Sequence, residues 1–344
     1  MVPELQCGIC KKNFDNLEVS PSQTALSGSN NSSLDEGFND LLNIYQPAPP
    51  VVRSFWPRKM PFRDLSLNRK YVLVNLSSYP RMMLPESKDS APPFVHSQSL
   101  VKNLLDRKFE SDSLARCAGI VAMWSVKNKD NSVYIWRAIR SEQERIFQQC
   151  YDYDDWELVA ALQAMCIYCI LRILEKDETV TDFDIPLIVT MTKVARRVGA
   201  QPAIHIRSEK SLLPRWEQWI IGESVRRTVF IIFIISSLFD VSVGLDHQAC
   251  GSAGYLAEMP LPSTKSMWNS STEADWTQEY MLSPVQSDLD QLLLFRDLLS
   301  QPNYNDENNI SEGGWMLDYW LTNVDEMGTL VVTAAKFSGN AFSN

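Results

Sequence analysis

The chain has 344 residues, of which 45% are hydrophobic and 22% are charged, and this is the composition of an ordinary globular protein. Its net charge of −10 is uneven: residues 1–110 carry 13 Lys and Arg against 11 Asp and Glu, and the remainder carries 19 against 31. An acidic body repels a phosphate backbone, so any contact with nucleic acid is expected from the N-terminal third.

The seven cysteines lie mostly in apolar stretches, which argues against a secreted disulfide framework. Residues 1–20 also lack the apolar core of a signal peptide. We therefore expect a reducing compartment, cytosol or nucleus.

The N-terminal segment contains a C-x2-C pair, Cys7 and Cys10, followed by Lys11 and Lys12. In a Cys-Cys-His-His zinc finger such a pair supplies two of the four zinc ligands. The two histidines expected about a dozen residues later do not occur before His96. The sequence therefore predicts half of a zinc site, to be completed by ligands from elsewhere, with both lysines as candidate DNA contacts.

Residues 21–78 are predicted to be a disordered linker, because residues 20–50 are rich in Ser, Asn, Gly and Pro. An apolar patch at 38–45 predicts a transient helix within it. A basic stretch, 53–70, includes Arg58 and Lys59, which are candidate DNA contacts or part of a nuclear-import signal. A solvated arm that docks its aromatic residues on the body is the preferred alternative, since short basic runs are common.

The next segment, residues 80–96, contains four prolines and is predicted to be an extended strap over the body. Apolar periodicity and capping residues then predict helices over residues 99–109, 113–124, 132–146, 156–175 and 181–199. The C-terminal part predicts an irregular loop at 246–277 pinned by Trp268 and Trp276, a helix from 283 to 299, a polar loop at 301–310 and a last helix over 311–337.

Residues 213–244 are predicted to form the central helix, around which the other helices pack. Every residue from 229 to 235 is apolar, so this part has no polar face and is expected to be buried on all sides. Pro214 suits the first helical turn, where its missing N–H costs nothing. Glu223 and Arg227 lie four residues apart and predict an ion pair along the helix.

Two other structures for this stretch are less favoured. A membrane span needs about 18 or more apolar residues, and Arg226, Arg227 and Asp240 bracket a shorter run. A buried strand would be shorter than the uninterrupted stretch 223–243, which contains no Gly or Pro. A core helix without a membrane partner is therefore expected.

No motif for a phosphate-binding loop, a zinc protease or a serine hydrolase occurs in the chain. The three histidines, His96, His205 and His247, each stand alone in their segments and are interpreted as structural residues rather than catalytic bases. Cys166 and Cys169 have the spacing of zinc ligands, but the apolar helix around them favours core thiols. We therefore expect no catalytic residues and no enzyme activity.

Several blocks in order along the chain resemble the regulatory domain of fungal zinc-cluster transcription factors, especially those that control secondary-metabolite gene clusters. The blocks are YPRMMLP with PPFVH (79–85 and 92–96), LARCAGIVAMW (114–124), WRAIRSEQERI (136–146), WELVAALQAMCIYCILRI (156–173), LPRWEQWIIGESVRRTVFIIFI (213–234), PLPSTKSMW (260–268) and VDEMGTLVVTAA (324–335).

This resemblance implies a nuclear, all-α regulatory domain over residues 79–344, and it carries over no catalytic residues. It also implies promoter binding through an N-terminal zinc module. Here the family's six-cysteine cluster is absent, and residues 1–20 hold only the half-finger of Cys7 and Cys10.

Two functions are weighed on these grounds. The first is a transcription factor for a fungal gene cluster, with zinc as cofactor and with DNA and the transcriptional machinery as partners. The second is a helical scaffold without DNA contact that modulates a sister regulator by protein–protein contact. Homodimerisation is a further expectation.

Overall fold

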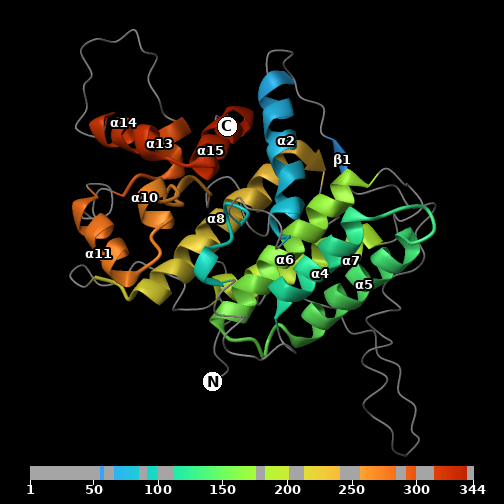
Figure 1. Cartoon of the computed structure of the whole chain (residues 1–344). Coiled ribbons are helices and arrows are strands. Elements are labelled where there is room, and N and C mark those ends of the chain that lie inside the picture. Colours follow the sequence, from blue (N-terminus) through green and yellow to red (C-terminus); the bar gives the residue numbers. More distant parts are fainter. Residues whose placement is uncertain are drawn as a thin grey trace, which may run out of the picture.

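The computed structural model describes residues 55–57, 66–84, 91–99, 112–175, 183–200, 213–240, 256–283, 292–299 and 314–338. These residues fold as an all-α protein, as predicted (Figure 1). The helices are α2 (Ser66–Met82), α4 (Ser113–Ser125), α5 (Ser132–Gln149), α6 (Asp155–Leu174), α7 (Asp184–Gly199), α8 (Trp216–Leu238), α10 (Lys265–Trp268), α11 (Glu273–Leu282), α13 (Phe295–Leu299), α14 (Gly314–Asn323) and α15 (Glu326–Ser338).

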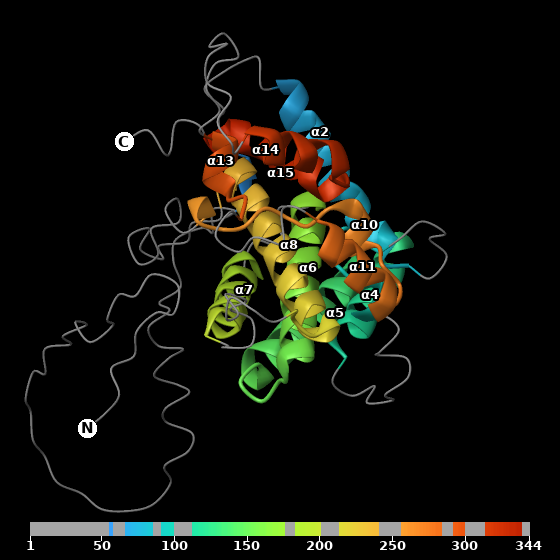
Figure 2. The same ribbon diagram turned by 90° about the vertical axis from the view of Figure 1, so that its left-hand side faces the viewer.

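Helix α6 occupies the middle of the structure. Every residue from Leu158 to Arg172 is buried, and α2, α4, α5, α7 and α8 all pack against it. Asp154 caps its N-terminus by accepting a hydrogen bond from the backbone N–H of Glu157 at 2.8 Å. Figure 2 shows α6 and α8 side by side, with α7 on one side and α4 and α5 on the other.

The stretch 213–244, predicted to be the central helix, forms the largely buried helix α8, but it shares the centre of the fold with α6, which is the more fully enclosed of the two. Helix α8 keeps a partly exposed side, on which Val229, Ile232 and Phe233 are only half-buried. Apolar content did not distinguish the two helices, because both are rich in large aliphatic residues. Their neighbours differ: α6 packs against five helices, whereas α8 packs against α6, α11, α15 and the short strand β2.

The ends of α8 also differ from the prediction. The helix begins at Trp216 and not at Pro214, because Arg215 is the extended N-cap residue. It ends at Leu238, because Phe239 is extended and pairs with an N-terminal strand. This small antiparallel sheet joins β1 (Trp56–Pro57) to β2 (Phe239–Asp240), and residues 241–244 lie outside the described part.

Among the described helices, α6 is long and apolar enough to cross a membrane by length and composition. However, 83% of its most apolar window is buried inside the protein. A helix enclosed by other helices has no surface for lipid, so these features are those of a core helix.

Helix α2 corrects two predictions at once. Its residues 66–78 were expected in the linker 21–78, and its residues 80–82 were expected in the strap. Helix formation is explained by Val72, Leu76 and Tyr79, whose helical spacing buries them on one side of α2. Pro80 removes one hydrogen bond near the C-terminal end, where the N–H of Met83 bonds back to the Pro80 carbonyl at 3.1 Å.

Residues 91–96 do run as an irregular strap, and Phe94 and Val95 anchor it in the core as expected, before the chain becomes helical at 97–99. The predicted helices that begin at Ser113 and Ser132 and the one that ends at Gly199 are confirmed. The predicted helix 99–109 and the polar loop 301–310 lie almost wholly outside the described residues.

The C-terminal part is more helical than predicted. The expected loop 246–277 contains α10 and the first half of α11, although Trp268 and Trp276 are buried as predicted. The last predicted helix is broken at Val324 and Asp325 into α14 and α15. Of the predicted helix 283–299, only α13 falls within the described residues and is helical; Ser283 instead follows the end of α11.

Candidate functional site

Arg227, on α8, is fully buried and lies at the centre of a polar cluster. Its Nε donates to Glu223 Oε1 at 2.8 Å, and this is the predicted ion pair. Its Nη1 donates to Asp325 Oδ2 at 2.5 Å and to the Pro93 carbonyl at 2.9 Å. Its Nη2 donates to the Ser263 carbonyl at 3.2 Å.

The partners of Arg227 come from segments that are far apart in the sequence. Pro93 belongs to the strap, Ser263 precedes α10, and Asp325 caps α15 by accepting from the Gly328 N–H at 3.1 Å. The guanidinium also lies over the Trp268 ring, 4.1 Å from its centre. We call this group the Arg227 cluster; it ties the C-terminal helices to α8 and the strap.

His96 lies beside the Arg227 cluster and is buried. Its Nδ1 accepts from the Gln98 N–H at 3.1 Å, and its ring meets Trp268 edge-on with centroids 4.7 Å apart. Burial, helped by the nearby Arg227 charge, lowers the pKa of His96 to about 4. His96 is therefore a neutral structural residue at pH 7, as expected; His205 and His247 lie outside the described residues.

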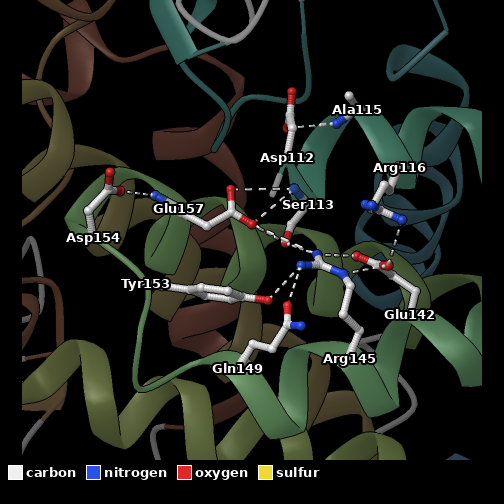
Figure 3. A network of polar contacts seen from close by, with 10 residues as sticks. All are labelled: Asp112, Ser113, Ala115, Arg116, Glu142, Arg145, Gln149, Tyr153, Asp154 and Glu157. Carbon is white, nitrogen blue, oxygen red and sulfur yellow. Dashed lines mark hydrogen bonds and ion pairs between the residues drawn. The ribbon is translucent and has the colours of Figure 1, made fainter. Parts of the chain in front are cut away.

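A second polar network joins the N-terminal ends of α4 and α6 to the C-terminal half of α5 (Figure 3). Arg145 lies at its centre: its Nη2 donates to Glu142 Oε1 at 2.6 Å and to Ser113 Oγ at 2.8 Å. Its Nη1 donates to the Tyr153 hydroxyl at 2.8 Å. The Arg145 network thus fixes the relative positions of three helices.

Glu157 is the carboxylate of the Arg145 network with the weakest link to a cation. Its Oε1 accepts from the Ser113 hydroxyl at 2.7 Å but lies 3.8 Å from Arg145 Nη2. Burial raises the pKa of Glu157 to about 7, because desolvation outweighs the Ser113 hydrogen bonds and the Arg145 charge. Glu157 therefore exchanges a proton near neutral pH.

A third network closes the C-terminal end of α6. Arg172 and Asp184 form a fully buried ion pair between α6 and α7. The Trp136 indole N–H donates to Glu175 Oε2 at 3.0 Å, and Lys127 Nζ lies 2.6 Å from the same oxygen. These contacts hold α5, α6 and α7 together at one end.

Cys117, Cys166 and Cys169 are fully buried, so Cys166 and Cys169 are core thiols as predicted. Burial raises the pKa of each thiol well above its usual value. Cys169 Sγ lies 3.7 Å from Met191 Sδ, which is a packing contact. No group of three or more His, Cys, Asp or Glu residues within the described ranges could hold a metal ion.

All the predicted metal and DNA contacts lie outside the described residues, namely Cys7, Cys10, Lys11, Lys12, Arg58 and Lys59. The structure neither joins nor separates them. Conversely, the sequence alone did not point to Asp325, Pro93 or Ser263 as partners of Arg227. Nothing in the spacing of residues 93, 227 and 325 indicates that they meet, because their contact depends on the packing of whole helices.

A small cavity lies between α6, α8 and the strap, with a volume of about 10 Å³. Ser224 Oγ and Gln163 line it, and Ser224 Oγ is buried without a protein hydrogen-bond partner. This volume holds about one water molecule, so this cavity is too small for an organic effector.

No family model matches the chain, and no solved structure matches it significantly. A search of known proteins finds the transcription factor gsfR2 of Penicillium aethiopicum, which is 23% identical over 223 residues. The match covers 61% of this chain and 50% of that protein, so the chain aligns with about half the length of this relative. Over three fifths of its length, the chain is thus similar to a fungal transcription factor.

Proposed function

We propose that the chain is a fungal transcription regulator and that its helical body is a regulatory domain rather than an enzyme. The observation that carries this proposal is the match to transcription factor gsfR2 over 61% of the chain. The order of the sequence blocks that resemble zinc-cluster regulators points the same way.

The use of the buried charged groups supports a binding and regulatory role. Arg227, Arg145 and Arg172 each bond to carboxylates from another part of the fold, and each joins two or more helices. A catalytic acid or base would face a cleft that admits substrate. Here the ionisable groups of all three networks serve helix packing.

The finer parts of the proposal concern residues outside the described structure. We assign promoter contact to the N-terminal region, with Lys11, Lys12, Arg58 and Lys59 on phosphates. A zinc ion would be held by Cys7 and Cys10 together with two ligands from a partner, since zinc prefers four ligands. Nuclear location and control of a secondary-metabolite gene cluster complete this proposal.

The test is binding of the purified full chain to a pool of random-sequence duplex DNA at 50 and 200 mM salt. Phosphate contacts by four cations predict an affinity loss of roughly a hundredfold over this range. The quadruple alanine variant at the four cationic positions is expected to lose both the affinity and most of the salt dependence. If this variant binds DNA as tightly as the wild type, the assignment of these four residues as DNA contacts is wrong.

The alternative function, a scaffold that modulates a sister regulator, is favoured by one observation: residues 111–344 carry 19 Lys and Arg against 31 Asp and Glu. Such a surface opposes DNA and suits a basic protein partner. Absence of DNA binding at 50 mM salt, together with chromatin immunoprecipitation signals that vanish when the partner is deleted, would support the scaffold. Zinc content by mass spectrometry decides whether Cys7 and Cys10 bind metal in either case.

A further inference from the structure

The outer face of α2 is an exposed apolar and basic stripe. Leu67, Tyr71 and Val74 follow one another at helical spacing and are 73%, 38% and 59% exposed. The other exposed residues along the same stripe are Lys70, Ser78 and Arg81. Monomeric proteins seldom expose three large apolar residues in a row on one helix, and such a stripe marks a contact surface.

The charge of α2 limits what can cover this stripe. The helix contains Arg69, Lys70 and Arg81 and no Asp or Glu, within a chain whose net charge is −10. A second copy of α2 would place these cations opposite one another, which is unfavourable. An acidic helix with one apolar face is the matching partner.

One segment of this chain has that chemistry. Residues 34–45 hold three acidic residues, and no Lys or Arg occurs from 13 to 52. Five apolar residues recur at the spacing of one helical face, namely Leu34, Phe38, Leu41, Leu42 and Tyr45. Ser33 and Glu36 have the spacing of a helix-capping box, and Pro47 suits the residue after a helix end.

The connection to the described structure is long enough for this contact. Phe55 is buried and precedes β1, and nine residues separate it from Tyr45. Such a connector spans up to about 35 Å when extended, whereas a helix of the length of α2 measures about 25 Å. Figure 1 draws β1 in the same upper part of the molecule as α2.

We propose that residues 34–45 dock as an amphipathic helix on the outer face of α2. Their apolar residues cover Leu67, Tyr71 and Val74, and the carboxylate of Asp35, which flanks this apolar face, lies near Lys70. This contact holds the N-terminal segment that carries Cys7 and Cys10 to the helical body. It does not depend on the proposed function, because it rests on α2 and the sequence alone.

Hydrogen exchange of the full chain, followed by mass spectrometry, tests the docking. In the wild type the amides of residues 34–45 are expected to exchange about tenfold more slowly than in the unfolded chain. Val74→Asp should abolish this protection. Val126→Asp, at a residue that is 68% exposed in the turn after α4, is the matched control and should leave the protection intact.

A charge exchange adds a test that a folding defect cannot mimic. Lys70→Glu should reduce the protection of residues 34–45, and Lys70→Glu combined with Asp35→Lys should restore it. Unprotected amides in the wild type overturn the proposal. So does protection that appears only at concentrations where the chain is a dimer by light scattering, because a second copy would then cover the stripe.

Discussion

At the scale of single residues, the fold depends on charges whose partners come from distant segments. Arg227 is fully buried and neutralised by Glu223 from its own helix and by Asp325 from the start of α15. Removing the Arg227 charge leaves the Asp325 carboxylate buried without this ion pair, which costs more than the intact pair contributes. The most sensitive positions are therefore polar.

Arg227→Met is expected to lower the free energy of unfolding by about 3–5 kcal/mol in urea denaturation, because Asp325 then loses its cation while buried and Glu223 keeps only the partly exposed Arg226. The matched control is Arg226→Met, since Arg226 contacts Glu223 but its side chain is 17% exposed. The control should lose no more than about 1 kcal/mol, because solvent screens a partly exposed pair. Equal losses would show that Arg227 is no more important than its neighbour.

Glu157 predicts a pH dependence of stability. Its pKa is raised to about 7 from a usual value of 4.5, so the folded state holds a proton that the unfolded state releases. The stabilisation from this proton is complete below about pH 4.5 and is lost as pH rises through about 7. The free energy of unfolding of the wild type should therefore fall over this range relative to Glu157→Gln.

The comparison with Glu157→Gln is needed because His96 acts in the opposite direction. Its pKa is lowered to about 4 from 6.5, so stability associated with His96 rises as pH increases between these values. The difference between wild type and variant cancels the His96 contribution. A difference that does not change with pH would contradict the raised pKa of Glu157.

At the scale of elements, the junction of α14 and α15 depends on a close approach of Gly328 to the side chain of Val324. A Cβ at Gly328 would lie 2.6 Å from Val324 Cβ and 2.7 Å from its Cγ1. Such a separation requires the chain to shift. Position 328 therefore has no room for a Cβ, and the break between α14 and α15 at Val324 and Asp325 is part of the fold.

Two Gly→Ala variants distinguish the steric cost of an added Cβ from the gain in helix propensity. Gly119→Ala in α4 meets no atom within 4 Å and should raise the free energy of unfolding by about 0.5–1 kcal/mol. Gly328→Ala should instead lower it by about 1–3 kcal/mol, since overpacking outweighs propensity. Thermal denaturation of both variants measures these changes. Stabilisation by both substitutions would contradict the expected clash between a Cβ at position 328 and Val324.

At the scale of the whole molecule, stability is expected to be greatest where burial is complete. All residues from Leu158 to Arg172 are buried in α6, whereas α8 keeps a partly exposed side. Amides in the core of α6 should therefore exchange with solvent only through global unfolding. Slower amide exchange in α8 than in α6 would contradict this expectation and would make α8 the most protected helix of the fold.

The sequence predicted the all-α class and several helix ends, because these depend on nearby residues. Asp154 caps α6 through a residue three positions away, and the Glu223–Arg227 pair spans one helical turn. The prediction that Pro80 lies in an extended strap is wrong, because it also rests on nearby residues alone. A local rule excludes proline from a helix, whereas α2 tolerates it near its end while Val72, Leu76 and Tyr79 are buried.

By itself the sequence determined helical periodicity, the acidic charge of the body, the incomplete C-x2-C site and the order of blocks that resembles fungal regulators. Tertiary structure alone decided that α6 and not α8 is enclosed, that Arg227 meets Pro93, Ser263 and Asp325, and that Glu157 is desolvated. The physical reason is the sequence separation of the interacting residues, because helix caps and helical faces depend on residues within a few positions of one another. Burial, and ion pairing between residues as far apart as Arg227 and Asp325, 98 positions, follow only from how the helices pack.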